Sequence, residues 1–231
     1  MANYPVEPES LAGFLPAGTE LDFHQGRTFV SLVGFRFLQT RLLGGRIAVP
    51  WHRDFDEVNL RFYVRRLDPA SGEQRRGVVF IKEIVPRLAI AAVARLRYRE
   101  RYISAPMRSQ ISENAVEFSW RIGGEWNRLR AQLAAEPWAE SAPGSEEEFI
   151  SEHYWGYSDR AAGGRRTLEY AVEHPRWRVR TVREFEAGLP GAEALYGAVL
   201  ARTLRSQKPS SVFLAEGSAV NVYCGVPLAA A

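Results

Sequence analysis

Cysteine is nearly absent from this sequence, and long apolar runs are absent altogether. The 231 residues include one cysteine, Cys224, which cannot form an internal disulfide and favours a cytoplasmic location. The first residues lack the basic region and apolar stretch of a secretory signal. No apolar run approaches the roughly 20 residues that cross a bilayer, so the sequence predicts a soluble protein with no membrane partner.

Lysine is scarce as well, because all but two of the 30 basic residues are arginines. The arginines are spread along the chain and interleaved with acidic residues, a pattern typical of solvated strand faces. No stretch combines clustered arginines with base-stacking aromatics. We therefore expect no nucleic-acid partner, and an arginine-based interaction module ranks third among the functions considered.

Familiar catalytic and metal-binding motifs are also missing. The four histidines lack zinc-ligand spacing, and His52, Asp54 and Asp56 form the one local cluster of this kind. No glycine-rich phosphate loop, Gly-x-Ser-x-Gly elbow or Cys/His pair is present. The sequence therefore predicts no metal site and no cofactor.

The sequence does contain ample material for a packed, strand-rich core. Hydrophobic residues make up 46% of the chain and aromatic residues 12%, and a chain of this length fits one β-rich domain. No repeat and no shift in composition marks a boundary. Residues 1–231 are therefore expected to form a single domain.

Most of the expected elements are strands, because β-branched and aromatic residues dominate segments bounded by turn residues. Strands are expected over 19–23, 27–38, 57–66, 75–84, 101–109, 115–122, 126–134, 165–173 and 176–184, with a closing hairpin of 212–215 and 219–225. Helices are expected over 7–14, 85–98, 146–154 and 192–204, and loops over 39–55 and 136–144. Tight turns are expected at 24–26 and at Gly123-Gly124, and Ser145 with Glu148 has the form of a capping box.

The strand that begins at Glu57 places polar groups along one face. Side chains alternate across a strand, so one face carries Glu57, Asn59, Arg61 and Tyr63, and the other carries Val58, Leu60, Phe62 and Val64. The apolar face must be buried. The polar face either meets water or lines a pocket, and spacing alone leaves both interpretations open.

A second strand, over 75–84, is almost wholly apolar until Lys82 and Glu83. A lysine at this place either reaches water or pairs with a carboxylate. If it stays desolvated, its lowered pKa suits Schiff-base or general-base chemistry. Lys82 and Glu83 are therefore candidate catalytic residues, although the catalytic residues are otherwise unknown.

Several segments occur in a distinctive order along nearly the whole chain. They are Phe14 to Leu21 followed by Gly26-Arg27, the strand Glu57 to Val64, Arg95-Leu96 before Tyr98, Tyr102 with Ala105 and Met107, and Gly144-Ser145 to Tyr154. In this order they resemble the YqjF-like family of uncharacterised proteins, catalogued as domain of unknown function 2071. That family is placed in the acetoacetate decarboxylase-like superfamily.

The resemblance implies an α+β fold, mainly antiparallel β: a cone-shaped β-barrel with a ligand cavity and a few flanking helices. It also implies that the Glu57 strand lines the cavity. Acetoacetate decarboxylase uses a lysine activated by an adjacent lysine, whereas the matching segment here, 101–106, contains none. Neither serine nor tyrosine can form the Schiff base of that mechanism, so we expect this mechanism to be absent.

These observations favour a protein that binds, or acts on, a small organic acid or carbonyl compound. Arg61 is expected to hold an anionic group, Glu57 and Asn59 to orient polar atoms, and Tyr102 and Ser104 to stand where the decarboxylase has its lysines. An enzyme that uses Lys82 as an amine nucleophile is the alternative. Whether the chain is catalytic stays open, and a homo-oligomer is compatible with the sequence.

Overall fold

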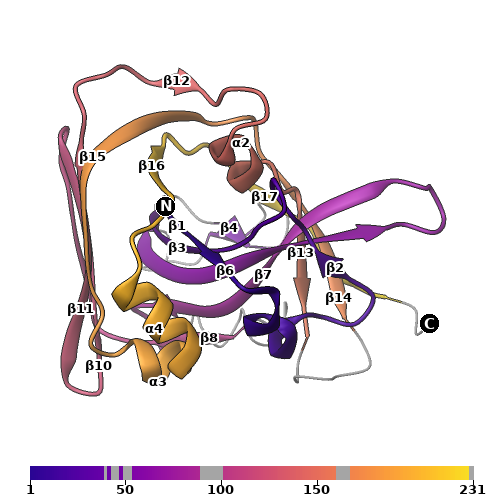
Figure 1. The fold of residues 1–231 in the computed structure, drawn as a ribbon, viewed down its shortest axis with the longest axis horizontal. Coiled ribbons are helices and arrows are strands. Elements are labelled where there is room, and N and C mark those ends of the chain that lie inside the picture. Colours follow the sequence, from indigo (N-terminus) through magenta and orange to yellow (C-terminus); the bar gives the residue numbers. More distant parts are fainter. Residues whose placement is uncertain (39–40, 43–46, 49–53, 89–100, 160–166, 229–231) are drawn as a thin grey trace.

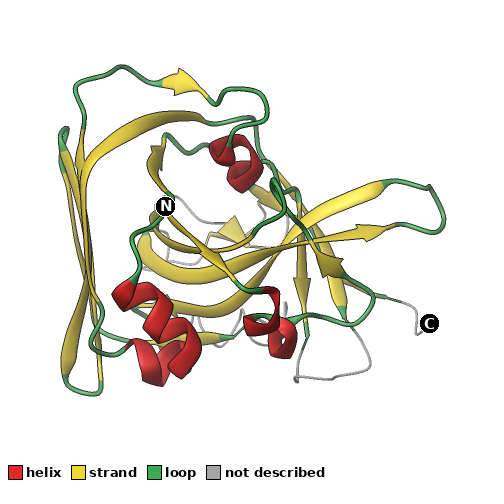
Figure 2. Cartoon of the chain, viewed as in Figure 1, coloured by secondary structure: helices red, strands yellow, loops and turns green. Residues whose placement is uncertain are grey.

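The fold of the chain was obtained as a computed structural model. The structure describes residues 1–38, 41–42, 47–48, 54–88, 101–159 and 167–228. Strands predominate, and the described helices are few and short (Figure 1, Figure 2).

The strands of the first half are β1 (Ala2–Val6), β2 (Glu20–Leu21), β3 (Thr28–Phe37), β4 (Arg41–Leu42), β5 (Ile47–Ala48), β6 (Phe55–Leu67), β7 (Gln74–Val85), β8 (Tyr102–Ser104) and β9 (Met107–Ile111). Those of the second half are β10 (Ala115–Ile122), β11 (Glu125–Leu133), β12 (Ala139–Glu140), β13 (Trp155–Ser158), β14 (Leu168–Glu173), β15 (Arg178–Gly188), β16 (Ser211–Ala215), β17 (Asn221–Val222) and β18 (Val226–Pro227). The helices are the 3-10 turns η1 (Pro8–Ser10) and η2 (Ala12–Phe14), and the α-helices α2 (Glu146–Ser151), α3 (Ala192–Tyr196) and α4 (Ala198–Ser206).

Hydrogen-bonded neighbours follow the order β17-β14-β13-β7-β6-β3-β1-β16-β15-β11-β10-β9. Nearly all of these pairs are antiparallel, while β7 pairs in parallel with β13 and with β8. The prediction of a mainly antiparallel fold with a few helices is thus confirmed. Strands from both ends of the chain also meet, because β1 lies between β3 and β16.

The long strands β3, β6 and β7 form the centre of the sheet. Their β-branched and aromatic side chains suit a pleated surface that is buried on both faces. The pairing of β6 with β7 shifts by one residue between Leu60 and Arg61, which marks a β-bulge in β7. This bulge determines on which face of the sheet the Lys82 side chain lies.

Helices cover the two faces of this centre. The apolar face of β6 joins a core cluster that also contains Leu195 from α3 and Leu200 from α4. Tyr63, on the polar face, packs against Phe149 of α2, with ring centroids 5.4 Å apart. In Figure 1, α3 and α4 accordingly lie below the central strands and α2 lies above them.

The expected helix over 192–204 is broken into α3 and α4 at Gly197. This residue has φ 81°, a left-handed conformation that glycine adopts without steric cost. The predicted helix over 7–14 is likewise present as η1 and η2 rather than as one helix.

The predicted helix start at Ser145 is confirmed, since its side chain accepts the backbone N–H of Glu148. Glu148 in turn accepts from the N–H of Gly144 at 2.7 Å, one residue before the position that a capping box would use. The helix ends at Ser151, earlier than predicted, because Trp155–Ser158 enters the sheet as β13 beside β7.

Four further expectations are corrected. The segments 212–215 and 219–225 do not form a hairpin, because β16 pairs with β1 and β15 whereas β17 pairs with β14. The expected loops over 39–55 and 136–144 contain the short strands β4, β5 and β12. The strand β1 was not predicted, and β2 pairs with β6 rather than with β3 across the turn.

Most of the expected helix over 85–98 lies outside the described residues. Arg95, Leu96, Tyr98 and His52 also lie outside them.

The two predicted tight turns are present. Gly123 and Gly124 have φ of 57° and 91°, as a two-residue type I′ hairpin requires, and they join β10 to β11. At 24–26 the backbone of His24 pairs with that of Arg27. Both turns therefore follow from local sequence.

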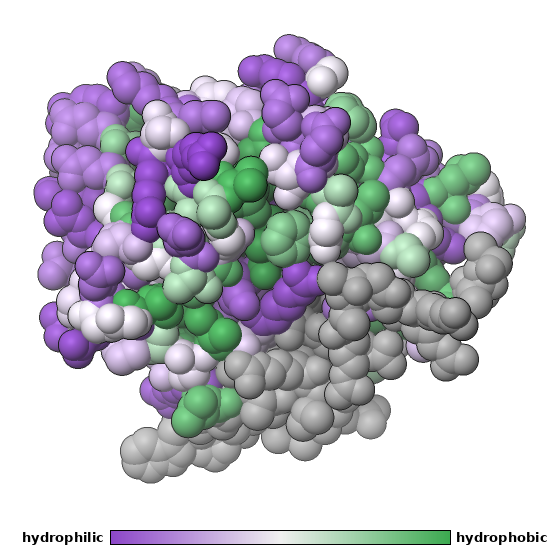
Figure 3. Space-filling view, turned by 60° about the horizontal axis from the view of Figure 1, so that its bottom comes forward, coloured by the Kyte–Doolittle hydropathy of each residue, from purple (hydrophilic) through white to green (hydrophobic). Residues whose placement is uncertain are grey.

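The surface mixes polar and apolar residues. Figure 3 shows apolar residues between polar ones across the middle of one face, and side chains such as Leu67 and Ile111 are more than half exposed. Within the described part of the chain, no helix combines the length and the apolar character that a bilayer crossing needs.

Candidate functional site

The polar face of β6 is buried rather than solvated. Glu57, Asn59 and Tyr63 are each 1% exposed, because β6 is flanked by β3 and β7 and its polar face is covered near Tyr63 by α2. Removing a carboxyl and an amide from water costs free energy unless hydrogen bonds replace the lost hydration. The buried polar face of β6 is therefore the candidate site.

Glu57 is held by two donors, one on each carboxyl oxygen. The Tyr102 hydroxyl donates to Oε2 at 3.0 Å, and the Asn59 amide donates to Oε1 at 3.0 Å. Burial raises the pKa of Glu57 to about 7, although both hydrogen bonds and the charge of Arg61 act in the opposite direction. Glu57 can therefore gain or lose a proton near neutral pH.

A row of polar side chains crosses three strands beside Glu57. Asn59 of β6 lies opposite Glu83 of β7, and Glu83 lies opposite Tyr102 of β8. Residues paired in this way project from the same face, and Glu83 is only 2% exposed. Ser104 lies two residues beyond Tyr102 and pairs with Val85, so alternation places it on the same face.

Arg61 extends the polar face towards α2. Its Nη2 atom lies 3.4 Å from the Met1 sulfur, and its guanidinium lies 5.8 Å from the centre of the Tyr63 ring. The Nε atom is buried without a hydrogen-bond partner in the described part of the chain. No carboxylate among the described residues forms a salt bridge with Arg61. A half-buried guanidinium without a salt-bridge partner among the described residues can bind an anionic group by donating hydrogen bonds to it.

A second polar cluster lies next to Arg61. His153 Nε2 lies 3.1 Å from Asp22 Oδ2, and Arg76 Nε donates to the same oxygen at 2.7 Å. The His153 ring packs on Tyr63, with centroids 4.6 Å apart. Burial lowers the pKa of His153 to about 4, although the hydrogen bond to Asp22 favours the charged form. The imidazole is therefore neutral at physiological pH.

This second cluster has no signature in the sequence. Asp22 and His153 are 131 residues apart in the chain, and neither lies in a motif with diagnostic spacing. Of the local cluster His52, Asp54 and Asp56, Asp56 forms a salt bridge with Arg36, at 2.9 Å, and His52 lies outside the described residues. No group of three or more potential metal ligands occurs among the residues that the structure describes.

The structure does not bring Lys82 to the Glu57 side of the sheet. Lys82 lies opposite Leu60, and the bulge directs it, together with Ile81, towards the apolar face of β6. Its neighbour Glu83 projects into the polar row instead. The two candidate catalytic residues are on different faces because neighbours in a strand alternate, and the bulge determines that Glu83, rather than Lys82, shares the face of Glu57.

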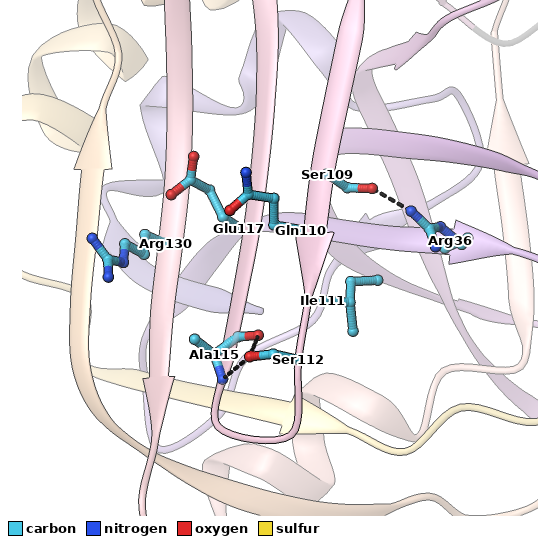
Figure 4. A pocket seen from close by; sticks show the side chains of 8 residues that line it. All are labelled: Arg36, Ser109, Gln110, Ile111, Ser112, Ala115, Glu117 and Arg130. Carbon is cyan, nitrogen blue, oxygen red and sulfur yellow. Dashed lines mark hydrogen bonds between the residues drawn. The ribbon is translucent and has the colours of Figure 1, made fainter.

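Two hollows border β9, away from the polar face of β6. The first measures about 520 Å³ and the second about 450 Å³. Figure 4 shows that the first lies where Arg36 reaches Ser109 and where the turn Ser112–Ala115 closes the β9–β10 hairpin. None of the predicted ligand-binding residues lines either hollow.

Three solved structures share this fold over nearly the whole chain. Acetoacetate decarboxylase from Legionella pneumophila subsp. pneumophila str. Philadelphia 1 is 13% identical, with a TM-score of 0.64, and the match covers 99% of this chain and 83% of that chain. An acetoacetate decarboxylase-like enzyme from Sphingomonas wittichii RW1 is 12% identical, with a TM-score of 0.59 and coverage of 100% and 90%. The enduracididine biosynthesis enzyme MppR, complexed with pyruvate, is 11% identical, with a TM-score of 0.55 and coverage of 98% and 81%. At these identities the likeness establishes the fold alone.

Sequence comparison identifies a relative and a family. The uncharacterized protein YqjF of Bacillus subtilis (strain 168) is 29% identical over 120 residues, which are 51% of this chain and 46% of YqjF. The match thus spans less than half the length of that relative. The model of the uncharacterized conserved proteins known as domain of unknown function 2071 matches residues 1–219, and the chain belongs to this family.

Proposed function

We propose that the buried polar face of β6 binds a small organic acid or carbonyl compound. The cone-shaped barrel that the family resemblance implies stays part of this proposal, since the hydrogen-bonded order of the described strands runs from β17 to β9 without closing. Arg61 holds the anionic group, and Glu57 and Asn59 orient the remaining polar atoms. Tyr102 and Ser104 complete the site from β8. The observation that carries this proposal is Glu57, a fully buried carboxyl with its pKa raised to about 7. It lies four residues along β6, and on the same face, from the guanidinium of Arg61, which has no salt-bridge partner among the described residues.

The charges around the site favour an anion. In the second cluster, Asp22 is already paired with Arg76 and His153 is neutral at physiological pH. The Arg61 charge is therefore left for a ligand carboxylate, which a guanidinium can bind through two parallel hydrogen bonds. The pyruvate of the MppR complex is an acid of this size and charge.

The proposed site has no lysine at the place that matches the lysine pair of the decarboxylase. Residues 101–106 contain no lysine, and Lys82 occupies the other face of the sheet. We therefore propose that any reaction proceeds by proton transfer through Glu57 rather than through a Schiff base. In such a step the Glu57 carboxylate takes a proton from the carbon next to a ligand carbonyl, and the C–H electron pair forms the enolate.

Ligand binding is tested by thermal shift with pyruvate, acetoacetate and related small acids. Binding raises the melting temperature of the native chain by mass action. Arg61→Ala should weaken binding by about 10- to 100-fold, because a charge-assisted hydrogen bond contributes about 1.5–3 kcal/mol. Arg183→Ala, on the exposed part of β15, is the matched control and should bind as the native chain does. If no small acid shifts the native chain, or if Arg61→Ala binds equally well, the proposal is wrong.

Turnover is tested separately from binding. In D2O, proton abstraction by Glu57 should exchange the methyl protons of bound pyruvate, as measured by NMR. Glu57→Gln should abolish this exchange, whereas the part of the affinity that depends on Arg61 should remain detectable by thermal shift. Borohydride trapping followed by mass analysis tests the alternative route. An adduct on Lys82 would replace the proposed mechanism with an imine mechanism.

A further inference from the structure

His153 has one ring nitrogen with a hydrogen-bond partner and one without. Its Nε2 atom lies 3.1 Å from Asp22 Oδ2, whereas its Nδ1 atom is buried and has no partner among the residues that the structure describes. The residue is 5% exposed. A buried polar atom without a partner costs free energy, and few such atoms occur in native proteins. Nδ1 is therefore a candidate contact for a bound molecule.

The contact with Asp22 fixes the tautomer of His153. Burial alone would raise the pKa of Asp22, but the hydrogen bonds from His153 and Arg76 lower it. The carboxylate is therefore ionised and can only accept, so His153 Nε2 must carry the proton. Since the ring is neutral at physiological pH, its Nδ1 atom holds a lone pair and can only accept a hydrogen bond.

The hydroxyl of Tyr63 does not supply this hydrogen bond, although the His153 ring packs on Tyr63. The Tyr63 hydroxyl lies 2.6 Å from Ser31 Oγ. Ser31 uses its own hydrogen to donate to Asn3 Oδ1, also at 2.6 Å, so Tyr63 must be the donor to Ser31. The Tyr63 hydrogen is thus already used, and Nδ1 needs a donor from elsewhere.

The order of side chains on the polar face of β6 relates Asp22 to Arg61. Side chains alternate across a strand, so Arg61, Tyr63 and Arg65 follow one another on this face. Arg76 of β7 pairs with Arg65, and its Nε atom donates to Asp22 Oδ2. Asp22 therefore lies towards the Arg65 side of Tyr63, and Arg61 lies on the other side.

The His153 ring spans the space between them. Its Nε2 atom is directed to Asp22, and because the two nitrogens of an imidazole point in diverging directions, Nδ1 is directed away from Asp22. Besides burial, the charge of Arg61 contributes to the lowered pKa of His153, as expected of side chains that are close together. Arg61 Nε is likewise buried without a partner among the described residues. A donor and an acceptor thus both lack partners beside the ring of Tyr63.

We propose that Arg61 and His153 bind the same small ligand, and that this ligand is an acid that carries a hydroxyl group. Its carboxylate accepts hydrogen bonds from the guanidinium, and its hydroxyl donates to Nδ1. An acid without such a donor leaves Nδ1 buried and without a partner, which weakens its binding. The inference rests on the proposed function, since it specifies which acid the polar face of β6 binds.

Charge favours a hydroxyl over an ammonium group as the donor. The ammonium of an amino acid could also donate to Nδ1. It would then lie near the charges of Arg76 and Arg61, both of which act on His153, and like charges repel one another. A carbonyl oxygen cannot donate at all. The site should therefore select a hydroxy acid over the corresponding amino acid and over the acid without a hydroxyl.

Isothermal titration calorimetry with pairs of acids that differ by one hydroxyl tests this selection. The pairs are glycolate and acetate, lactate and propionate, and 3-hydroxybutyrate and butyrate. In at least one pair the native chain should bind the hydroxy acid about tenfold more tightly, because the hydroxyl satisfies a buried acceptor. Alanine should bind more weakly than lactate. Equal affinities within all three pairs overturn the inference.

Two variants assign the selection to His153. His153→Phe keeps an aromatic ring against Tyr63 and should lose the preference for the hydroxy acid, while the parent acid still binds. His24→Phe is the matched control and should keep the preference, since both histidines pack on Phe149 with ring centroids 5.1 Å apart. Circular dichroism checks that both variants are folded. A preference that persists in His153→Phe shows that another group binds the hydroxyl and overturns the inference.

Nitrogen-15 NMR of histidine-labelled protein shows whether the ligand reaches Nδ1. The hydroxy acid should shift the Nδ1 signal of the native chain, which is assigned by its loss in His153→Phe, and the parent acid should leave it nearly unchanged. If acids bind through Arg61 without a hydroxyl preference and without this shift, the inference is wrong and the proposed function stands. If no acid binds the native chain, the proposed function fails, and the inference fails with it.

Discussion

At the scale of single residues, the most informative group is the carboxyl of Glu57. It is 1% exposed and is held by the Tyr102 hydroxyl and the Asn59 amide. A group buried in this way changes its proton affinity on folding, because burial disfavours the charged form. The stability of the protein must therefore depend on the protonation of this carboxyl.

The pH dependence has a definite sign. In the unfolded chain Glu57 ionises near its ordinary pKa of 4.5, whereas in the folded chain its pKa is about 7. Between these values the folded state binds the extra proton, so the free energy of unfolding falls as pH rises. Compared with Glu57→Gln, the native chain should lose roughly 3 kcal/mol across this window. Urea unfolding at a series of pH values measures this difference.

One other buried group, His153, must be considered alongside this measurement. His153, with its pKa lowered to about 4, contributes the opposite slope, because only the unfolded chain binds its proton between about pH 4 and 6.5. This contribution is common to both proteins and cancels in the difference. Glu184→Gln, at an exposed carboxyl of β15, is the matched control. If Glu57→Gln and the native chain respond to pH in parallel, the raised pKa of Glu57 is wrong.

At the scale of elements, the parallel contact between β7 and β13 depends on a glycine. Gly77 lies opposite Trp155, and a Cβ at Gly77 would lie 2.7 Å from the Trp155 carbonyl oxygen and 2.6 Å from the Tyr157 ring. A backbone atom and a fully buried ring cannot both move aside, so the close approach of these strands requires glycine.

Gly77→Ala should therefore destabilise the chain by about 1–3 kcal/mol, the usual cost of overpacking. Gly13→Ala is the control, because a Cβ there meets nothing within 4 Å. Chemical denaturation of both variants measures the effect. Equal stability of the two variants would mean that β7 and β13 are not packed this closely.

At the scale of the whole molecule, distant parts of the sequence are interleaved in one sheet. β1 from the N-terminal part is flanked by β3 and β16, and the main core cluster combines residues of β6, β10, α3 and α4. Such interleaving couples the elements energetically. The organisation of residues 1–231 as a single domain stays a prediction.

This prediction can be tested through Leu200, which is 1% exposed within the main core cluster. Leu200→Ala should cost about 2–5 kcal/mol and shift one calorimetric transition to lower temperature. Val199→Ala, at a position that is 60% exposed, should leave the transition nearly unchanged. A scan that splits into two transitions, only one of which moves, would indicate separate domains.

Much of the local structure could be predicted from the sequence, because it depends on short-range chemistry. The alternation from Glu57 to Val64 marks a strand with one polar face, glycines at 123 and 124 favour a tight hairpin turn, and Ser145 begins a helix. The order of motifs along the chain indicated the family. These features need only neighbouring residues, or the order of residues in the chain.

Only the tertiary structure decided which groups meet. It buried the polar face of β6, placed Glu83 beside Asn59 but Lys82 on the other face through one bulge, and joined His153 to Asp22 across 131 residues. It also separated β16 from β17 by pairing each with a different strand. Alternation along one strand specifies which side chains share a face, but pairing with strands from elsewhere in the chain determines whether that face is buried and what it contacts.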